Sequence, residues 1–506
     1  MGLKWNYRVW AVLITILARW QFTLLAVPGE ADYGKIDAYL AGRFREVGVP
    51  GAAFVVITNN QIAHFRGIGV AGPDGRAIQP QTPFGIGSVS KSFGALAVMQ
   101  LVEAGKIDLD APVRRYLPGF RTTDPAVSGA ITVRHLLHHQ SGLPTFVSHA
   151  SWEDRYDPTA ALDRAMAFMP EVRLKETPGQ SFLYSDPGYV VLAAVVQAVS
   201  GKPFEKYLQE AVLAPLGLRH SFTSEVAARS DGAATGYRYW FGKAVPHGGL
   251  SSCYFDPLAG GGIYCSAEDL AAYLIAHMSN GRAGKHRVLS EAGFERLHTP
   301  AVATTGMHYA MGWMVFSNAF ELPCLVSHGG ITPKYSAYAT MIPDRGIGFV
   351  LLLNANPETG LEFIEFAVAR MLLGMSPTTA SDPSALVGVM RRAACVGVTL
   401  MVAILLVRSI TLLRRFPRLA AEPQSSWKWR KLRSALALVF CLAVFVLVLF
   451  IPNFFETHIQ ALLDYSPDIG WLLILCGASA LMSTITHLLL QKKPQVERFL
   501  PTRPKL

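Results

Sequence analysis

Ser88 and Lys91 are three residues apart in the segment PFGIGSVSKSFG, where an apolar helical pattern begins. That spacing places both side chains on one face of a helix, roughly 5–6 Å apart at Cβ. A helix N-terminus adds free backbone N–H groups and a positive dipole end. A serine needs a base to become a nucleophile, and a desolvated lysine can lose its proton near neutral pH. The pair could therefore perform nucleophilic catalysis, although S-x-x-K alone is a common chance match and an isolated Ser88 would be a helix cap.

Two further motifs with polar residues follow Ser88 and Lys91 along the chain. PGQSFLYSDPGY supplies Tyr184 and Asp186, and VSHGGITPKYS supplies His328 after an apolar run. Longer stretches also contribute to a family resemblance; they include LVEAGKIDLDAPVRRYLP, ITVRHLLHHQSGLP and AGGGIYCSAEDLAAYL. Over about residues 35–370 the chain resembles the class C β-lactamase and D-alanyl-D-alanine peptidase group of serine hydrolases, which includes related esterases and D-amino-acid peptidases.

The resemblance implies a catalytic role for several residues. Ser88 would be the acylated nucleophile, Lys91 its proton partner, and Tyr184 an assisting base in acylation and deacylation. The backbone N–H groups of Ser88 and Ile331 would form an oxyanion hole. Such donors are worth about 2.7–4 kcal/mol each in comparable enzymes.

Two departures from the family pattern bear on substrate choice. Asp186 replaces the usual asparagine, and an ionised aspartate only accepts hydrogen bonds. It could recognise a substrate amine, pair with Lys91 and raise the pKa of that lysine, or face solvent as a tolerated variant. His328 stands where many members carry a lysine that orients the substrate, and Gly329 and Gly330 would let a substrate strand approach the backbone closely. Because His328 lacks a lysine's fixed charge, we expect neutral or amine-bearing substrates to be preferred over anionic β-lactams and D-Ala-D-Ala termini.

The part of the chain that holds these motifs alternates between helical and strand-like patterns. β-rich runs at residues 52–58 and 347–353 lie near its opposite ends, and helical patterns cover residues 90–104, 187–199 and 267–277. Strands at both ends predict a sheet built from the two termini with a helical insertion between them. The resemblance implies an α/β (α+β) β-lactamase/transpeptidase-like domain over residues 32–375, with an antiparallel sheet flanked by helices and a helical subdomain.

The C-terminal quarter of the chain differs in composition. Residues 385–506 hold 15 basic and 5 acidic residues, whereas residues 1–384 hold 31 of each. The basic excess therefore belongs to the tail and does not indicate a nucleic-acid-binding face. Three apolar stretches in the tail are near the length of about 20 residues that crosses a bilayer. They predict an all-α membrane region over residues 393–506, after a linker at 376–392, with transmembrane helices at about 393–413, 435–452 and 469–490.

Flanking charges predict the orientation of this region. The segment around the first connection, residues 408–433, carries eight basic residues and one acidic residue, whereas the second connection carries three acidic residues and no lysine or arginine. By the positive-inside rule the C-terminus is cytoplasmic, and the catalytic domain lies on the periplasmic or extracellular side of the cell membrane. Residues 1–31 have the order of a secretory signal peptide, although an uncleaved N-terminal anchor is the alternative.

An exported hydrolase domain followed by three spans resembles membrane-bound peptidases that mature nonribosomal-peptide prodrugs, such as the colibactin-activating peptidase. The resemblance to these peptidases is weaker around Tyr184 and Cys265, where the chain offers no obvious set of polar groups to hold a substrate amide. A D,D-carboxypeptidase, an esterase or a β-lactamase would use the same residues, and a non-enzymatic penicillin sensor is the alternative of another class. Expected partners are a small peptide, amide or ester substrate, the lipid bilayer, and an exporter or a second copy of the chain bound through the transmembrane helices.

No metal or other cofactor is expected. His135, His138 and His139 have helical spacing, but no HExxH motif accompanies them, and the family commonly has a packing histidine here. Three cysteines in the exported part permit at most one disulfide, for which Cys253 and Cys265 are one possible pair.

Overall fold

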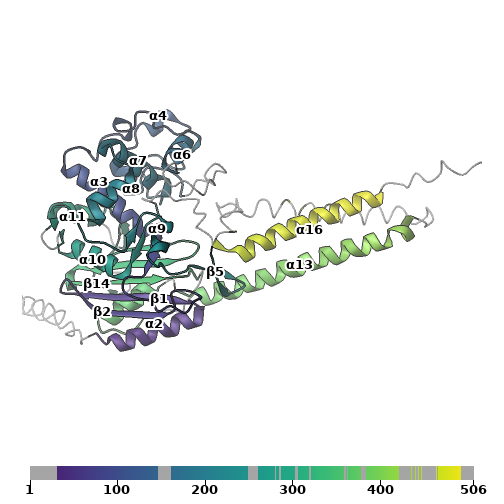
Figure 1. The fold of residues 1–506 in the computed structure, drawn as a ribbon. Helices are drawn as coiled ribbons and strands as arrows, with labels where there is room; N and C mark the ends of the chain where they lie inside the picture. The colour runs from purple at the N-terminus through teal and green to yellow at the C-terminus, as the bar shows by residue number, and fades with distance from the viewer. Residues whose placement is uncertain are drawn as a thin grey trace, which may run out of the picture.

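The computed structural model describes most of the chain (Figure 1). It covers residues 31–145, 161–248, 260–279, 281–283, 286–301, 306–317, 321–357, 360–361, 363–377, 383–420 and 466–491, with isolated positions between 435 and 465. Nearly all of the predicted signal or anchor at 1–31, and most of the predicted span at 435–452, lie outside these residues.

A seven-stranded antiparallel sheet forms the base of the domain that holds the predicted motifs. Its strands run in the order β10 (Gly306–Tyr309), β11 (Met314–Ser317), β12 (Leu325–Ile331), β13 (Ser336–Ile342), β14 (Ile347–Leu353), β1 (Gly51–Thr58) and β2 (Gln61–Gly69). Ala52 of β1 lies opposite Leu353 of β14, and Thr58 lies opposite Ile347. The prediction of an antiparallel sheet built from both ends of the domain is thus confirmed.

Both faces of the central strands are buried, because helices cover the sheet on both sides (Figure 1). Val55 and Ile57 of β1 join one core with α10 (Ala267–Met278), whereas Phe54 and Val56 join a second core with α2 (Tyr33–Val47) and α12 (Ile364–Leu372). Burying each such side chain contributes about 1.5–3 kcal/mol. This explains why the run at 52–58 is apolar throughout and does not alternate.

The helical part packs beside the sheet around α3 (Ser90–Glu103) and α7 (Asp186–Ser200), which contact each other and are almost entirely buried. Together with α10, these helices match the predicted helical runs to within two residues at each end. The other helices are α4 (Pro125–Ser128), α5 (Val133–Leu137), α6 (Ala161–Phe168), α8 (Phe204–Leu208), α9 (Glu225–Ser230) and α11 (Glu291–His298). Short helical turns are η1 (Gly87–Val89), η2 (Val113–Arg115), η4 (Met169–Glu171), η5 (Gln209–Leu213) and η7 (Pro343–Arg345).

Three small sheets complete the domain: β3 (Pro83–Gly85) with β7 (Tyr264–Ser266) and β4 (Ser221–Phe222); β5 (Tyr237–Trp240) with β6 (Lys243–Pro246); and β8 (Arg282–Ala283) with β9 (His286–Arg287). The first of these places β3 directly before η1, where the predicted nucleophile lies.

Two long helices extend from the domain, α13 (Pro383–Ala420) and α16 (Pro467–Gln491), and lie side by side (Figure 1). Leu405 of α13 packs against Cys476 and Ala480 of α16. Helix α13 begins at Pro383, so residues 383–392, expected as linker, are helical. Proline suits the first position of a helix because its φ is already helical and its missing N–H would have no partner there.

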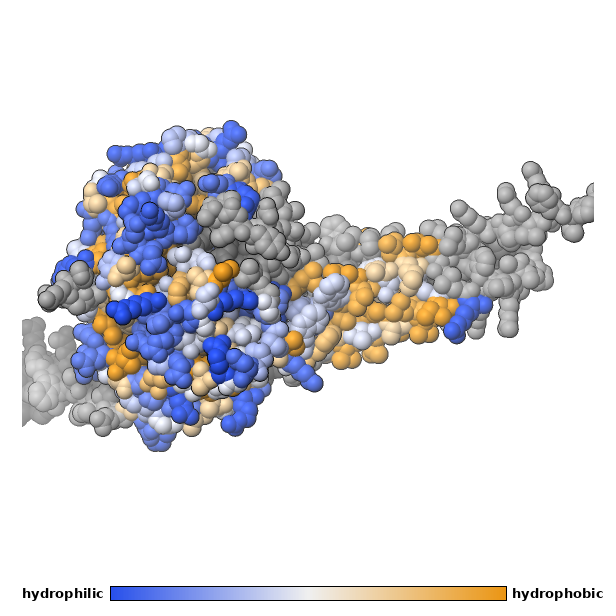
Figure 2. Space-filling model, viewed as in Figure 1, coloured by the Kyte–Doolittle hydropathy of each residue, from blue (hydrophilic) through white to orange (hydrophobic). Residues whose placement is uncertain are grey.

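Within the described residues, one helical segment, Pro467–Ile485, is long and apolar enough to cross a membrane. The apolar segment of α13, Cys395–Thr411, is shorter and contains Arg408. Of the two predicted spans that the described residues cover, one is thus long and apolar enough to cross a membrane, and the span at 435–452 stays a prediction. Figure 2 shows apolar residues covering the visible face of these two helices, and Val396, Leu400, Ile404 and Val407 of α13 are all exposed.

Candidate active site

Ser88 lies in η1, between β3 and α3, and its side chain is half-buried. Lys91 lies in the first turn of α3 and is fully buried, with its Nζ donating a hydrogen bond to Ser88 Oγ at 2.9 Å. Neighbouring serines fix this turn: Ser90 Oγ accepts a bond from the Ile263 N–H at 3.2 Å, and Ser92 Oγ donates to the Val89 carbonyl at 2.7 Å. The predicted S-x-x-K pair therefore meets at a rigid strand–helix junction.

The Lys91 ammonium has three acceptors. Besides Ser88 Oγ, these are the Gly260 carbonyl oxygen at 2.6 Å and Asp186 Oδ1 at 2.6 Å. A protonated lysine has three N–H donors and no lone pair, so Nζ cannot accept a proton until it has given one up. Burial lowers the pKa of Lys91, but the charge of Asp186 and then Tyr184 outweigh burial, so the pKa is raised.

Asp186 is the first residue of α7 and is only 8% exposed. Its backbone N–H donates to the Thr145 carbonyl at 3.2 Å, while Ser185 caps the helix by accepting a bond from the Gly188 N–H. Of the three sequence-based interpretations of Asp186, the structure shows the ion pair with Lys91. Among the described residues, Lys91 Nζ is the one polar partner of Oδ1, as an ion pair.

Tyr184 faces the same pair, with Lys91 Nζ 5.0 Å from the centre of its ring. Burial raises the pKa of the phenol, and the Lys91 charge and contact with Ser88 only partly oppose this. Tyr184 is therefore a neutral phenol near pH 7. The structure thus brings together the three residues expected to be catalytic, Ser88, Lys91 and Tyr184.

Backbone N–H groups meet where the end of β12 packs against η1. Gly87 has a positive φ of 51°, and a Cβ built on it would lie 2.7 Å from the Ile331 nitrogen. A Cβ on Gly330 would lie 1.9 Å from the Ile86 carbonyl oxygen and 3.1 Å from the Ser88 nitrogen. The missing side chains of Gly87 and Gly330 let the two backbones touch, which brings the backbone nitrogens of Ser88 and Ile331 to the same contact. Two such nitrogens beside a nucleophile are the donors that oxyanion stabilisation needs.

His328 of β12 is buried and bonded at both ring nitrogens. Nδ1 lies 2.7 Å from the Gly329 carbonyl oxygen, and Nε2 lies 3.0 Å from the Tyr309 hydroxyl. A carbonyl only accepts, so Nδ1 carries the proton and Nε2 accepts from Tyr309. Burial and the nearby Lys91 charge lower the pKa of His328 to about 3. This position of β12 therefore supplies no cation at neutral pH.

An aromatic shell that the sequence analysis did not predict surrounds Lys91. The His139 ring lies 4.3 Å from the Tyr184 ring, 4.4 Å from Tyr309 and 5.1 Å from Tyr189. His139 Nδ1 also accepts a hydrogen bond from the Ser185 N–H at 3.0 Å. This histidine thereby holds the segment that carries Tyr184 and Asp186, and its only sequence signal was the packing histidine of the RHLLHHQSGLP motif.

The other two histidines of that motif also have structural contacts. His135 forms a capping box with Thr132 at the start of α5, and His138 Nδ1 lies 3.3 Å from the Tyr309 carbonyl oxygen. In the part of the chain that the structure describes, no group of three histidine, cysteine or acidic side chains has the arrangement of a metal site. Cys265 is a free, buried thiol 3.1 Å from Ser221 Oγ, and Cys253 lies outside the described residues.

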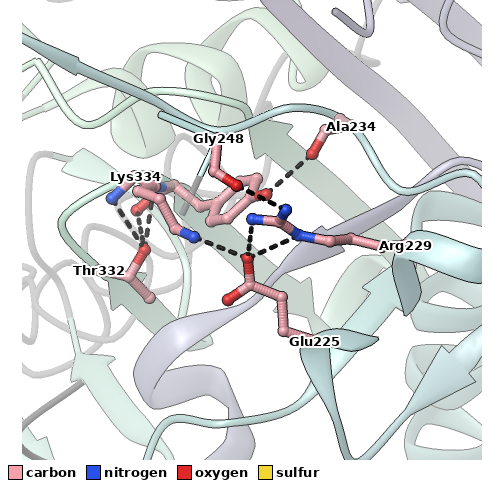
Figure 3. Close-up of polar contacts among 7 residues, drawn as sticks. Glu225, Arg229, Ala234, Gly248, Thr332 and Lys334 are labelled. Carbon is pink, nitrogen blue, oxygen red and sulfur yellow. Dashed lines mark hydrogen bonds and ion pairs between the residues drawn. The ribbon is translucent and has the colours of Figure 1, made fainter. Parts of the chain in front are cut away.

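A charge cluster around the buried Lys334 holds the β12–β13 hairpin (Figure 3). Lys334 Nζ lies 2.7 Å from Glu225 Oε1, which also accepts from Arg229 Nη2 at 2.6 Å. Arg229 Nη1 donates to the Gly248 carbonyl at 2.8 Å. Because Lys334 is three residues beyond Ile331, the cluster fixes the end of the strand that carries this amide. No sequence motif indicates this contact, since Lys334 and Glu225 are 109 positions apart.

Comparisons with known proteins agree with this fold. A family model described as Beta-lactamase matches residues 36–370. Protein flp of Staphylococcus aureus (strain COL) is 26% identical over 336 residues, covering 65% of each chain. A Bacillus subtilis protein named as a penicillin-binding protein, PbpX, is 30% identical over 306 residues, covering 60% of this chain and 68% of its own. The match thus spans slightly less than two thirds of the length of the staphylococcal relatives.

Solved structures show the same fold. An octameric penicillin-binding protein homologue from Pyrococcus abyssi matches with a TM-score of 0.61 and 28% identity, covering 70% of this chain and 79% of that one. A class C β-lactamase matches with a TM-score of 0.58 and 21% identity, covering 69% and 97% respectively.

Proposed function

Because this chain belongs to the β-lactamase family, whose fold implies serine hydrolase activity in general, we propose that it hydrolyses acyl substrates through an acyl-enzyme on Ser88. The observation that carries this proposal is the contact of Ser88 Oγ with Lys91, beside Tyr184 and the close approach of the β12 backbone to η1. Ser88 Oγ attacks the substrate carbonyl, and the N–H groups of Ser88 and Ile331 stabilise the developing oxyanion. Tyr184, a neutral phenol, donates a proton to the leaving group. Water then hydrolyses the acyl-enzyme ester on Ser88.

We propose a peptidase or amidase acting on peptides, or on peptide-derived metabolites, that contain D-residues. The resemblance to D-alanyl-D-alanine peptidases supports this class, as does the similarity to a protein named as a penicillin-binding protein. The neutral His328 supports acyl substrates without a carboxylate at the position where many family members place a lysine. Maturation of an exported nonribosomal-peptide prodrug is the narrowest form of this proposal.

A panel of substrates tests this proposal against its alternatives. We expect a higher kcat/KM for N-acyl-D-amino-acid amides and esters than for penicillins or D-Ala-D-Ala peptides. Faster release of terminal D-alanine would indicate a D,D-carboxypeptidase, and preferential opening of penicillin would indicate a β-lactamase. Cleavage of esters but not of matched amides would indicate an esterase. Acylation by penicillin without turnover of any substrate would indicate a sensor.

We also propose that the chain is exported and anchored in the cell membrane by α13 and α16, with the catalytic domain outside. The exposed apolar side chains of both helices support a lipid environment, because water-exposed helices seldom carry such continuous apolar surface. Asp468 at the start of α16 supports a fixed distance between domain and membrane, since its Oδ2 accepts a hydrogen bond from the Phe241 N–H at 3.0 Å. Any exporter or second copy of the chain would bind through the same helices.

A further inference from the structure

The proton of the Ser88 hydroxyl needs an acceptor during acylation. Most of the ionisable groups in the site cannot accept it. The raised pKa of Lys91 keeps Nζ protonated, without a lone pair, beside Ser88 Oγ, the Gly260 carbonyl oxygen and Asp186 Oδ1. Burial raises the pKa values of the surrounding tyrosines and lowers those of the surrounding histidines, so that all of them are neutral near pH 7; these residues are Tyr184, Tyr189, Tyr309, His139 and His328. A neutral phenol cannot take up a proton, and a buried imidazole with a strongly lowered pKa takes one up at high cost.

Asp186 is the one carboxylate among the described residues that contacts Lys91. Its Oδ1 lies 2.6 Å from Nζ and accepts nothing else in that part of the chain, so protonation there breaks no other bond. The buried Asp269 differs, because its Oδ2 accepts from the His220 N–H and from Ser221 Oγ at 2.7 Å each. Asp186 can therefore accept and return a proton, whereas Asp269 stabilises the segment at His220 and Ser221.

We infer that Asp186 receives, through Lys91, the proton that leaves Ser88 during acylation. The inference rests on the proposed acyl-enzyme and adds the residue that stores the proton. A proton moves from Lys91 Nζ to Asp186 Oδ1, and the freed lone pair of Nζ accepts the Ser88 hydroxyl proton. The bond from Ser88 Oγ to the carbonyl carbon forms as the carbonyl π pair moves to the oxyanion. The oxyanion pair then re-forms the carbonyl, the bond from carbon to the leaving group breaks, and Tyr184 gives its proton to that group. The proton stored on Asp186 returns through Lys91 to Tyr184.

The test is the pH dependence of acylation in the full chain and in Asp186→Asn. The p-nitrophenyl ester of N-acetyl-D-alanine is a suitable probe, because nitrophenolate leaves without a proton and its burst reports the serine step. Near pH 7 we expect Asp186→Asn to acylate roughly 10²-fold more slowly, the usual size of a general-base contribution. In this variant Lys91 must release its proton to solvent before it can act. Because that release becomes easier at higher pH, the deficit should shrink as the pH rises.

Two matched variants serve as controls. Asp186→Glu keeps a carboxylate beside Lys91 and should keep the parental pH dependence. Asp269→Asn removes a buried carboxylate outside the site and should leave that dependence unchanged. A ratio of parent to Asp186→Asn rates that is constant with pH would show a purely structural role and overturn the inference, as would equal rates.

The parent alone supplies a second test, which does not depend on folding of the variants. With Asp186 storing the proton, acylation should stay nearly level from about pH 9 down to about pH 6, below the usual pKa of lysine. A tenfold fall in rate per pH unit across this range would mean that Lys91 loses its proton to solvent, and would overturn the inference. Failure of a fluorophosphonate to label Ser88 would instead overturn the proposed acyl-enzyme itself.

Discussion

Lys91 and Asp186 form a buried ion pair in a site that is otherwise neutral among its described side chains. Buried pairs add little net stability when both partners are present, because desolvation offsets their attraction. Removing one partner is different, since it leaves an uncompensated charge in the interior. The pair therefore couples the reactivity of Ser88 to the stability of the domain.

This coupling predicts the effect of Lys91→Met. We expect the variant to lose activity and about 3–5 kcal/mol of stability, because Asp186 is left buried and unpaired. Adding Asp186→Asn should restore most of the stability but none of the activity. Thermal unfolding of the detergent-solubilised full chain compares the two variants. Equal unfolding midpoints for the single and double variants would show that the ion pair does not matter to folding.

Sequence reasoning found Ser88, Lys91, Tyr184, Asp186 and His328, because each lies in a short motif whose spacing has a chemical meaning. It did not find the Gly260 carbonyl or the aromatic shell of His139 and its tyrosines. Those groups reach Lys91 only through tertiary packing, and the Gly260 carbonyl is 169 positions away from it. The choice between the three interpretations of Asp186 likewise required the position of α7 relative to α3.

At the scale of elements, the essential contact is the approach of β12 to η1. The strand is held from the side by the Lys334–Glu225–Arg229 cluster and reaches the nucleophile through two glycines. Gly329 and Gly330 differ sharply in what a side chain would meet. A Cβ on Gly329 would have ordinary contact with the Tyr338 ring at 3.8 Å, whereas one on Gly330 would collide with the Ile86 carbonyl oxygen.

Gly330→Ala should therefore push β12 away from η1 and withdraw the Ile331 amide from the oxyanion. We expect kcat to fall by about 10²–10³-fold, the effect of losing one oxyanion donor. Gly329→Ala is the matched control and should keep kcat within a few-fold of the parent. Equal losses in the two variants, measured on one activated ester, would argue against an oxyanion hole at this contact.

The main helices and terminal strands were predictable because apolar periodicity decides them. Helices α3, α7 and α10 and strands β1 and β14 begin and end within two residues of their predicted bounds. The short strands β10 and β11, on one side of the sheet, were not predicted, since four-residue segments carry little periodic signal. Helix α13 extends N-terminally into the predicted linker because proline at its first position starts the helix early.

At the scale of the whole molecule, the catalytic domain continues into α13 and α16, and Asp468 ties the start of α16 to the β5–β6 hairpin. The two helices expose apolar side chains along their length, as Figure 2 shows on its visible face. The acidic Asp468 lies at the domain end of α16, whereas basic residues follow its far end. This charge asymmetry gives the orientation of the proposed membrane region.

The orientation predicts the behaviour of reporter fusions. A reporter fused after Leu506 should be active only if it requires the cytoplasm, and one inserted near His458 only if it requires export. The reason is that residues 408–433 are basic whereas the connection that follows is acidic, and basic connections stay in the cytoplasm. The reverse pattern would place the catalytic domain in the cytoplasm and remove the argument for exported substrates.

Buried histidines predict that acid destabilises the domain. Burial lowers the pKa of His138 and His298 to about 4 and that of His328 to about 3. Between these values and the unfolded pKa of about 6.5, the unfolded chain binds more protons, so stability falls as the pH falls. The buried carboxyls Asp269 and Glu365, whose pKa values burial raises, act in the opposite sense but are fewer among the described residues. Unfolding midpoints should decline from pH 7 to pH 5, and a rise over that range would contradict this account.

The central claim is that Ser88 is acylated, and covalent labelling tests it most directly. Membranes containing the full chain are treated with a fluorophosphonate or a penicillin probe, and the modified peptide is mapped by mass spectrometry. We predict one adduct, on Ser88, that is absent from a Ser88→Ala variant which folds and inserts normally and whose hydrolysis is lower by several orders of magnitude. An adduct on another residue, or hydrolysis retained by Ser88→Ala, would contradict the account.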